Sequence, residues 1–374
     1  MIIGVLKEPK GEKRVSLLPE HIVALRKQHV NVMIEKGAGD NAYAIDAQYE
    51  TAGASVGSRN VVLESADIIL SIHSLTENDI TDCKGKILFG FYQPLFNAGY
   101  IKVLAEKNFT IFSIDMLPRT TRAQSMDVLS SQANIAGYKA VLLAANLYPK
   151  YFPMFMTAAG SIPPAKILIL GAGVAGLQAI ATAKRLGAVV EVFDTRPQVK
   201  EEVMSLGAKF VEVEGAADAA KAGGYAVEQS AEFMARQKAR IAESVAKSDI
   251  IITTAAIPGK KAPVLITEEM ITGMKNGSVI IDLAASTGGN TAHTKNDETV
   301  VVNGVSIVGN SALAADMPSD ASKLYGKNIF NFLQLIIDKS GAINLNFEDD
   351  LVKGTCVAHG GIITNERVEA ALNS

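Results

Sequence analysis

Residues 166–187 read Lys166-Ile-Leu-Ile-Leu-Gly171-Ala-Gly173-Val-Ala-Gly176-Leu-Gln-Ala-Ile-Ala-Thr-Ala-Lys-Arg-Leu-Gly187, and they indicate the architecture more clearly than any other segment. A short apolar run leads into three glycines at G-x-G-x-x-G spacing, and a helical pattern follows. A second apolar run, residues 189–193, then ends in Asp194. This order of elements is typical of a dinucleotide-binding βαβ unit.

Each glycine of this unit has a predicted task. Gly171 allows the tight turn, Gly173 lets backbone approach a pyrophosphate, and Gly176 lets the helix pack closely on the strand. The phosphates would lie at the positive helix N-terminus. Asp194 follows Gly176 by 18 residues, where an acid that binds the ribose hydroxyls is expected. The alternative is a tight strand–helix turn that binds nothing.

The end of the second strand also bears on which dinucleotide is bound. The Asp194 carboxylate favours NAD over NADP, because it would repel a 2′-phosphate. Arg196 leaves NADP open, since a nearby arginine can accept that phosphate.

Composition limits the function classes. A chain of 374 residues predicts two domains, and 48% hydrophobic with 20% charged residues is normal for a globular protein. The net charge of −3 and the absence of Trp argue against nucleic-acid binding. Cys83 and Cys356 are predicted to be reduced thiols, and the histidines lack metal-ligand spacing, so no metal site is predicted. No signal peptide or membrane-spanning run is predicted.

Short apolar runs alternate with helical patterns along most of the chain, which predicts mostly parallel sheets. The predicted strands are residues 2–6, 31–35, 66–72, 86–91, 110–114, 166–170, 189–193, 209–212, 249–253, 278–283 and 305–308. The predicted helices include residues 19–28, 127–148, a segment starting near 228, and 325–338.

We therefore predict an α/β protein with two Rossmann-like domains. Residues 1–135 and 320–374 form one domain, and residues 136–319 form the NAD(H)-binding domain inserted into it. The nucleotide would lie in the cleft. The glycine pair at 223–224, within an Ala- and Gly-rich stretch, predicts either a hinge or an ordinary surface loop.

A polar segment, residues 118–132, follows a predicted strand and begins the long helix. Gln124 and Asp127 are three residues apart, so on a helix they would share a face. Arg119 could pair with Asp127 or reach the cofactor, and Gln124 could hydrogen-bond a nicotinamide amide or its ribose. The alternative is a helix N-terminus with polar capping groups.

A self-sufficient dehydrogenase needs an acid–base group for the substrate proton. No His or Lys is a compelling candidate. His73 is the one cleft candidate by position, and we interpret it as a solvated histidine at a loop edge. Lys7, Glu8 and Arg14 could form a charged cluster, which we interpret as structural rather than catalytic.

The whole chain resembles the NAD(H)-binding component of proton-translocating NAD(P) transhydrogenases, in the form of the first polypeptide of a split alpha subunit. The signatures that carry the resemblance are residues 119–127, 156–160, 171–188, 222–225 and 258–266. The resemblance implies that NAD(H) is bound here and NADP(H) on a partner beta subunit. Hydride then passes directly between the nicotinamides, without a general base.

The resemblance also implies partners and a location. A membrane-spanning transhydrogenase subunit would couple the reaction to proton translocation. This chain would form a homodimer and lie peripherally on the cytoplasmic face of the inner membrane.

Site residues are carried over one by one. The resemblance assigns Arg119, Gln124, Asp127 and Ser130 to the nicotinamide end, and Gly224 and Tyr225 to a mobile loop that closes over the nucleotide. The remaining cofactor-binding assignments are Gly171, Gly173, Val174, Ala175 and Gly176 at the pyrophosphate, Asp194 and Arg196 at the adenosine ribose, and Ala256 and Ile257 at the adenine or ribose. Residues 312–316 depart from the family pattern.

A related family, alanine dehydrogenase, shares Lys7, Glu8, Arg14 and Val15. Its pyruvate pocket uses a lysine, a histidine and an aspartate, and the aligned positions here hold His73, Gln93 and Ser286. Amino-acid dehydrogenase activity is therefore disfavoured, but it stays as the alternative function. A non-catalytic NAD-binding regulator is a third hypothesis.

Overall fold

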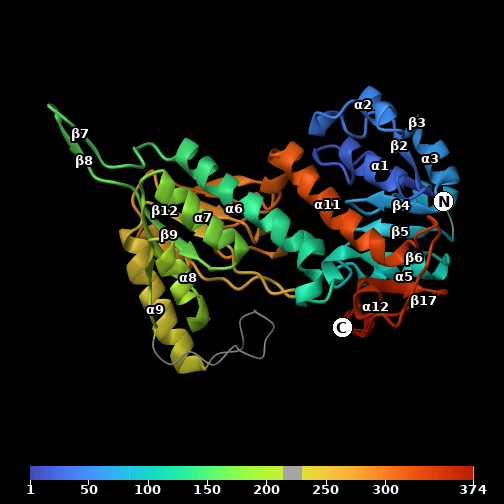
Figure 1. Ribbon diagram of the computed structural model, residues 1–374. Helices are drawn as coiled ribbons and strands as arrows, with labels where there is room; N and C mark the ends of the chain where they lie inside the picture. Colours follow the sequence, from blue (N-terminus) through green and yellow to red (C-terminus); the bar gives the residue numbers. More distant parts are fainter. Residues whose placement is uncertain (84, 214–229, 374) are drawn as a thin grey trace. The chain divides into compact units, whose positions relative to one another are not determined.

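The computed structural model describes residues 1–83, 85–213 and 230–373 (Figure 1). The chain divides into two compact units. Unit 1 comprises Met1–Gln132 and Met317–Ser374, and unit 2 comprises Ala133–Asp316. The domain boundaries expected from the sequence, after residues 135 and 319, each lie three residues further along the chain.

Unit 1 contains an eight-stranded sheet in the order β17-β16-β6-β5-β4-β1-β2-β3. The strands are β1 (Ile2–Val5), β2 (Asn31–Glu35), β3 (Ser55–Gly57), β4 (Ile68–Ser71), β5 (Ile87–Gly90), β6 (Thr110–Ser113), β16 (Cys356–His359) and β17 (Ile362–Ile363). All neighbours are parallel except at the β6–β16–β17 edge, which is antiparallel. The prediction of mostly parallel sheets is confirmed, and the antiparallel pairs of this sheet are confined to its one edge.

Helix α11 (Pro318–Ile336) belongs to unit 1 and packs on this sheet. Phe332 lies with its ring centroid 5.0 Å from that of Phe89 on β5 and 5.7 Å from that of Phe112 on β6. The helix begins seven residues before the predicted start at Tyr325. Its first turns are mainly polar, so they lack the apolar periodicity from which the helix was predicted. Pro318 at the first helical position is nevertheless a regular signal of a helix start.

Other helices of unit 1 surround the sheet. They are α1 (Pro19–Arg26), α2 (Asp46–Thr51), α3 (Arg59–Ser65), α4 (Glu77–Asp82), α5 (Ala98–Glu106), α12 (Asp350–Thr355) and α13 (Glu366–Leu372). Cys83 and Cys356, both in this unit, are buried free thiols. Burial raises the pKa of each thiol to about 11, so both stay protonated at neutral pH.

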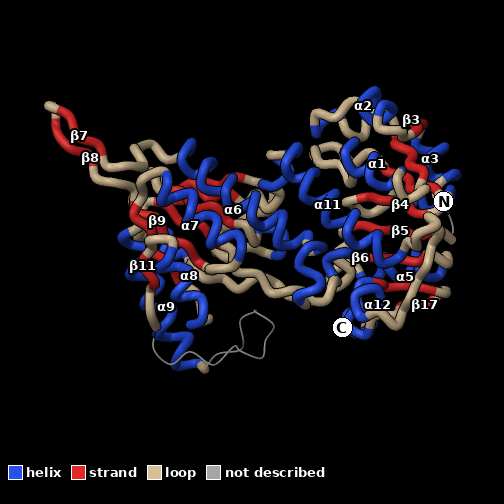
Figure 2. The backbone as a smooth tube through the Cα atoms, viewed as in Figure 1, coloured by secondary structure: helices blue, strands red, loops and turns tan. Residues whose placement is uncertain are grey.

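Unit 2 contains a seven-stranded sheet in the order β11-β10-β9-β12-β13-β15-β14, drawn with red strands in Figure 2. The strands are β9 (Lys166–Leu170), β10 (Val189–Phe193), β11 (Lys209–Phe210), β12 (Ile250–Thr253), β13 (Val279–Asp282), β14 (Thr299–Val302) and β15 (Val305–Val308). Only the edge strand β14 is antiparallel in this sheet. The chain winds outward from β9 in both directions, so the topological switch point lies between β9 and β12.

Both faces of this sheet are covered, which explains the unbroken apolar run of β9. Ile167 and Ile169 belong to the core that includes Ile180 of α7 (Val174–Arg185). Leu168 on the opposite face shares a core with Ile241 of α9 (Ala231–Lys247). The remaining helices are α6 (Val128–Leu147), which runs from one unit into the other, and α8 (Lys200–Ser205) and α10 (Glu268–Thr272) in unit 2.

A two-stranded hairpin completes unit 2, formed by β7 (Phe155–Thr157) and β8 (Gly160–Ile162). Figure 1 shows it extending away from the seven-stranded sheet of its own unit. Within the described ranges, no helix combines the length and apolar character that a membrane crossing requires.

Candidate functional site: the glycine turn and its neighbours

The turn after β9 has the geometry that its three glycines predict. Gly171 has a left-handed φ of +104°, and a Cβ there would lie 2.3 Å from Thr254 Oγ1. A Cβ on Gly176 would lie 1.9 Å from the Gly171 carbonyl oxygen. Both positions therefore exclude every residue that has a side chain.

Gly173 has the opposite surroundings. Apart from its chain neighbours and the adjoining helix backbone, no described atom lies within 4 Å of the place where its Cβ would be. Gly173 is the N-cap of α7, and Val174, which begins the helix, is 40% exposed. The first N–H groups of α7, among them those of Val174 and Ala175, have no intrahelical partner, because every helix leaves its first turn of donors unpaired. An open N-terminus of this kind is a favourable place for a phosphate.

Asp194 lies at the end of β10 and is tied to the same turn. Its Oδ2 accepts a hydrogen bond from the Ala172 N–H at 2.7 Å and from Arg196 Nη2 at 2.8 Å. Its Oδ1 accepts from Arg196 N at 2.8 Å and Arg196 Nε at 2.9 Å. The hydrogen bond with Asp194 raises the pKa of Arg196.

These contacts fill the acceptor positions of the Asp194 carboxylate, which number about four. A ribose hydroxyl can bind this carboxylate only if Arg196 releases part of it. The sequence predicted both residues at this place but not their bidentate pairing with each other.

The loop after β12 is joined to the glycine turn. The Thr254 N–H donates a hydrogen bond to the Leu170 carbonyl oxygen at 2.9 Å. The Thr254 hydroxyl donates to the Gly171 carbonyl oxygen at 3.2 Å. Ala256 and Ile257 follow after Ala255, and Ala256 is exposed while Ile257 is half-buried. The two loops lie at the carboxyl ends of adjacent strands, where ligands of open α/β sheets bind.

The polar segment of unit 1 forms the 3₁₀ helix η3 (Thr121–Met126) followed by α6. Asp127 caps α6, since its Oδ1 accepts from the Ser130 N–H at 2.9 Å and its Oδ2 from the Ser130 hydroxyl at 2.5 Å. Gln124 and Asp127 therefore do not share one α-helix face, contrary to the prediction. The capping alternative describes Asp127 and Ser130 correctly.

Gln124 differs from its neighbours in this segment. Its side chain is exposed and has no hydrogen-bond partner among the described residues. The amide is thus available to a ligand. Arg119 is also exposed, and it interacts with another group of the protein.

A charged cluster lies elsewhere in unit 1, centred on Glu12, a residue that no sequence pattern singled out. Glu12 accepts hydrogen bonds from Arg14 Nη2 at 2.7 Å and lies 2.9 Å from His73 Nε2. Glu8 accepts from the N–H groups of Ile72 and His73 at 2.6 and 3.1 Å. The His73 side chain is 49% exposed, which agrees with the prediction of a solvated histidine at a loop edge. It is also paired with Glu12, which that prediction did not include.

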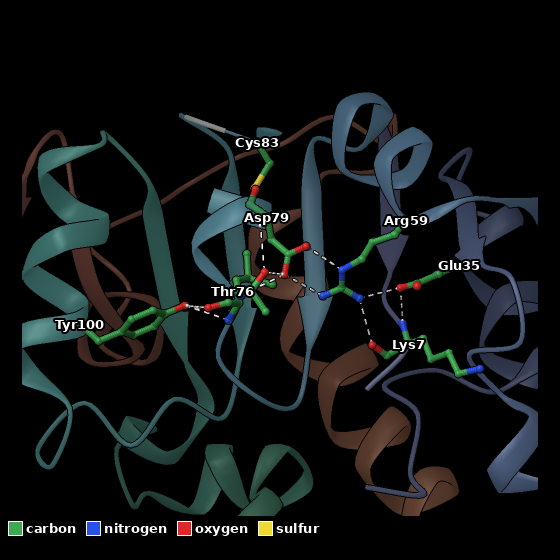
Figure 3. A network of polar contacts seen from close by, with 8 residues as sticks. Lys7, Glu35, Arg59, Thr76, Asp79, Cys83 and Tyr100 are labelled. Atoms are coloured by element: carbon green, nitrogen blue, oxygen red, sulfur yellow. Dashed lines mark hydrogen bonds and ion pairs between the residues drawn. The ribbon is translucent and has the colours of Figure 1, made fainter. Parts of the chain in front are cut away.

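Lys7 belongs to a different network, shown in Figure 3. Its N–H donates to Glu35 and its carbonyl oxygen accepts from Arg59 Nη1. Arg59 also forms a two-bond pair with Asp79, at 2.6 and 2.9 Å. The contacts with Glu35 and Arg59 are made by backbone groups of Lys7, so the predicted grouping of its side chain with Glu8 and Arg14 stays a prediction.

The sequence also singles out four positions in other segments. Gly224 and Tyr225 lie outside the described residues. Gln93 has a left-handed φ of +49°, and Ser286 is exposed in a short 3₁₀ turn. In the part of the chain that the structure describes, no group of three or more His, Cys, Asp or Glu side chains could hold a metal ion.

Comparisons with known proteins agree with this architecture. Residues 4–136 match the N-terminal domain, and residues 140–366 the C-terminal domain, of the alanine dehydrogenase/PNT family. The first polypeptide of the NAD(P) transhydrogenase alpha subunit of Rhodospirillum rubrum is 44% identical over 376 residues, which cover 98% of each chain. The crystal structure of a transhydrogenase from Sinorhizobium meliloti matches with a TM-score of 0.89 and 44% identity, over 97% of this chain and 100% of that one.

An alanine dehydrogenase from Staphylococcus saprophyticus is 27% identical over 383 residues, covering 100% of this chain and 97% of that protein. The class is thus an α/β oxidoreductase with two Rossmann-like units. The chain belongs to the alanine dehydrogenase/PNT family, and within it to the NAD(P) transhydrogenase alpha subunits.

The charged cluster predicts a pH-dependent stability. Burial raises the pKa of Glu8 to about 7, and the hydrogen bond to Glu12 raises the pKa of His73. Both groups hold a proton more tightly in the folded state, so their stabilising contribution is lost as pH rises. For Glu8 the loss runs from its unfolded pKa up to about 7, and for His73 it runs from about 6.5 upward. We expect the melting temperature to fall between about pH 6 and about pH 8.

In His73→Asn this fall should be smaller, as measured by circular dichroism at both pH values. His29→Asn is the control, because His29 is an exposed histidine with a left-handed φ of +61° that asparagine tolerates. An equal fall in melting temperature with pH in wild type and His73→Asn would exclude His73 as a source of the pH dependence.

Proposed function

We propose that this chain is the NAD(H)-binding catalytic component of a proton-translocating transhydrogenase. The observation that carries the proposal is the glycine turn at the switch point of unit 2, with Gly173 and the N-terminus of α7 open beside it. The relatives named as transhydrogenase alpha subunits support the choice of this reaction over others of the fold.

The residues have proposed roles at the two ends of the nucleotide. Gly171, Gly173, Val174, Ala175 and Gly176 would hold the pyrophosphate, Asp194 with Arg196 the adenosine ribose, and Ala256 and Ile257 the adenine or ribose. Arg119, Gln124, Asp127 and Ser130 would position the nicotinamide end, and Gly224 and Tyr225 would close over the nucleotide.

When bound, the nicotinamide gives or accepts a hydride. We propose direct transfer to or from NADP(H) on a partner beta subunit, so no substrate proton moves. The protein then needs no general base, and its contribution is to orient the ring and exclude water. The charged cluster around Glu12 has no part in this proposal.

The name of the Rhodospirillum relative describes it as one portion of an alpha subunit, which supports the existence of further subunits. We propose that one of them spans the membrane and couples hydride transfer to proton translocation. This chain would then lie on the cytoplasmic face of the inner membrane, bound through these partners.

Alanine dehydrogenase activity is the second candidate, favoured by the 27% identical relative. Against it stand His73, Gln93 and Ser286 at the positions where that enzyme has its lysine, histidine and aspartate. Turnover of alanine or pyruvate by the purified chain, without other subunits, would favour this alternative over transhydrogenation.

The Gln124 amide provides the test of the reaction. Gln124→Ala should slow single-turnover hydride exchange about tenfold in a preparation that contains the partner subunits, because the ring loses one orienting group. NADH affinity should change less. Gln334→Ala, an exposed glutamine on α11, is the control. An unaltered rate in Gln124→Ala would remove this residue from the site, and no exchange in wild type would reject the proposal.

The pairing of Asp194 with Arg196 predicts the nucleotide preference. Asp194→Asn should weaken NADH binding about tenfold, since a neutral amide is the weaker acceptor for ribose hydroxyls. Arg196→Ala should retain NADH binding but weaken NADPH binding, because a 2′-phosphate would then face an uncompensated carboxylate.

Calorimetric titration with both nucleotides measures these effects. Glu191→Gln is the matched control, since Glu191 is a carboxylate on β10 that pairs with Lys209 at 3.1 Å. NADH affinity at the wild-type level in Asp194→Asn would show that the ribose assignment is wrong.

The β7–β8 hairpin supports a homodimer. Phe155, Met156 and Ile162 are 44%, 71% and 36% exposed, and the ring of Phe155 stacks on Tyr151 at 5.2 Å. Apolar side chains gathered on a projecting arm are typical of a protein contact. We expect Met156→Asp to weaken a dimer in sedimentation equilibrium, and Met204→Asp, an exposed methionine of α8, to leave it intact. A monomeric wild type would contradict the dimer.

A further inference from the structure

One buried side chain, the amide of Asn290, ties both ends of the loop after β12. Its Oδ1 accepts a hydrogen bond from the Ala255 N–H at 3.0 Å. Its Nδ2 donates to the carbonyl oxygens of Ala255 at 2.8 Å and Pro263 at 2.9 Å. A single amide thus pairs with both backbone groups of Ala255 and reaches the far end of the loop.

Asn290 is itself fixed by a buried carboxylate. Asp282, at the end of β13, is fully buried, and its Oδ2 accepts from the Asn290 N–H and the Thr294 hydroxyl, each at 2.6 Å. Gly289 has a φ of +78°, and a Cβ there would lie 2.5 Å from Thr294 Cβ. The sheet therefore sets the position of the Asn290 amide, and the turn leaves no room for a substituted residue before it.

The loop held in this way adjoins the proposed nucleotide site. Thr254, the residue before Ala255, is bonded to the glycine turn, and Ala256 and Ile257 come directly after it. Every side-chain hydrogen bond of Asn290 goes to the backbone of this loop. Loss of the amide would leave two carbonyl oxygens and one N–H of the loop without their partner.

We propose that Asn290 is a positioning residue for nucleotide binding, which holds the loop of Ala256 and Ile257 in its binding-competent conformation. The inference rests on the proposed NAD(H) site. Without the amide the loop occupies several conformations. The apparent NADH affinity is then the intrinsic affinity multiplied by the fraction of molecules whose loop is in the binding-competent conformation. A residue that only supports the fold would lower stability and leave affinity unchanged.

Asn290→Ala in the full chain tests this, with the NADH dissociation constant measured by calorimetry. We expect the dissociation constant to rise about tenfold, which corresponds to a binding-competent loop in about one tenth of the molecules. The control is Asn365→Ala, because Asn365 also makes two side-chain bonds to backbone, to Arg367 N and Gly354 O, but lies in unit 1. That variant should keep the wild-type constant. An unchanged constant in folded Asn290→Ala would overturn the inference.

A second variant covers the case in which Asn290→Ala does not fold. Asn290→Asp fills the same volume and keeps an acceptor for the Ala255 N–H, but it places an oxygen opposite two carbonyl oxygens. We expect it also to weaken NADH binding, and wild-type affinity in this variant would contradict the proposal.

Amide hydrogen exchange without nucleotide gives a measurement that is independent of binding. Exchange across residues 255–263 should be faster in Asn290→Ala or Asn290→Asp than in the wild type, and equal exchange in a folded variant would overturn the positioning role. A wild type that does not bind NADH at all would instead reject the proposed function. The two failures are therefore distinguishable.

Discussion

The absence of side-chain atoms at Gly171 and Gly176 is the constraint on which the rest of unit 2 depends. It lets the Gly171 carbonyl oxygen come within 1.9 Å of where a Cβ of Gly176 would be, and it lets Thr254 lie directly against the turn. The N-terminus of α7, the end of β9 and the loop after β12 consequently meet at one edge of the sheet. Asp194 then reaches the Ala172 N–H across the same turn. A methyl group at either glycine would separate these parts.

Much of the fold could be predicted from local sequence. The predicted strand at 189–193 matches β10, and that at 305–308 matches β15, because short, mainly apolar runs between polar breakers are typical of strands in a sheet covered on both faces. The start of α11 could not be predicted so well. Its first turns are mostly polar and exposed, and the buried Ser322 among them is held by a partner from a distant part of the chain. Its hydroxyl accepts a hydrogen bond from the Val15 N–H, which joins residues 307 positions apart.

The candidate site likewise contains some residues that the sequence predicts and others that only the fold reveals. The glycine turn and Asp194 follow from spacing along the chain, since one βαβ unit contains all of them. Glu12 and Asn290 depend on partners brought close only by the fold, such as His73 for the first and Ala255 for the second. A glycine pair before Asn290 signals a turn, but no local pattern identifies the loop that its amide binds.

The placement of the two cysteines has a practical consequence. Both are buried thiols of unit 1, and unit 2 contains no cysteine in its sequence. A maleimide reagent can modify them only after the surrounding core has opened, because a protonated, shielded sulfur is a poor nucleophile. The rate of alkylation in mild denaturant therefore reports the unfolding of one half of the molecule without a contribution from the other, and the native chain contains this probe without any engineering.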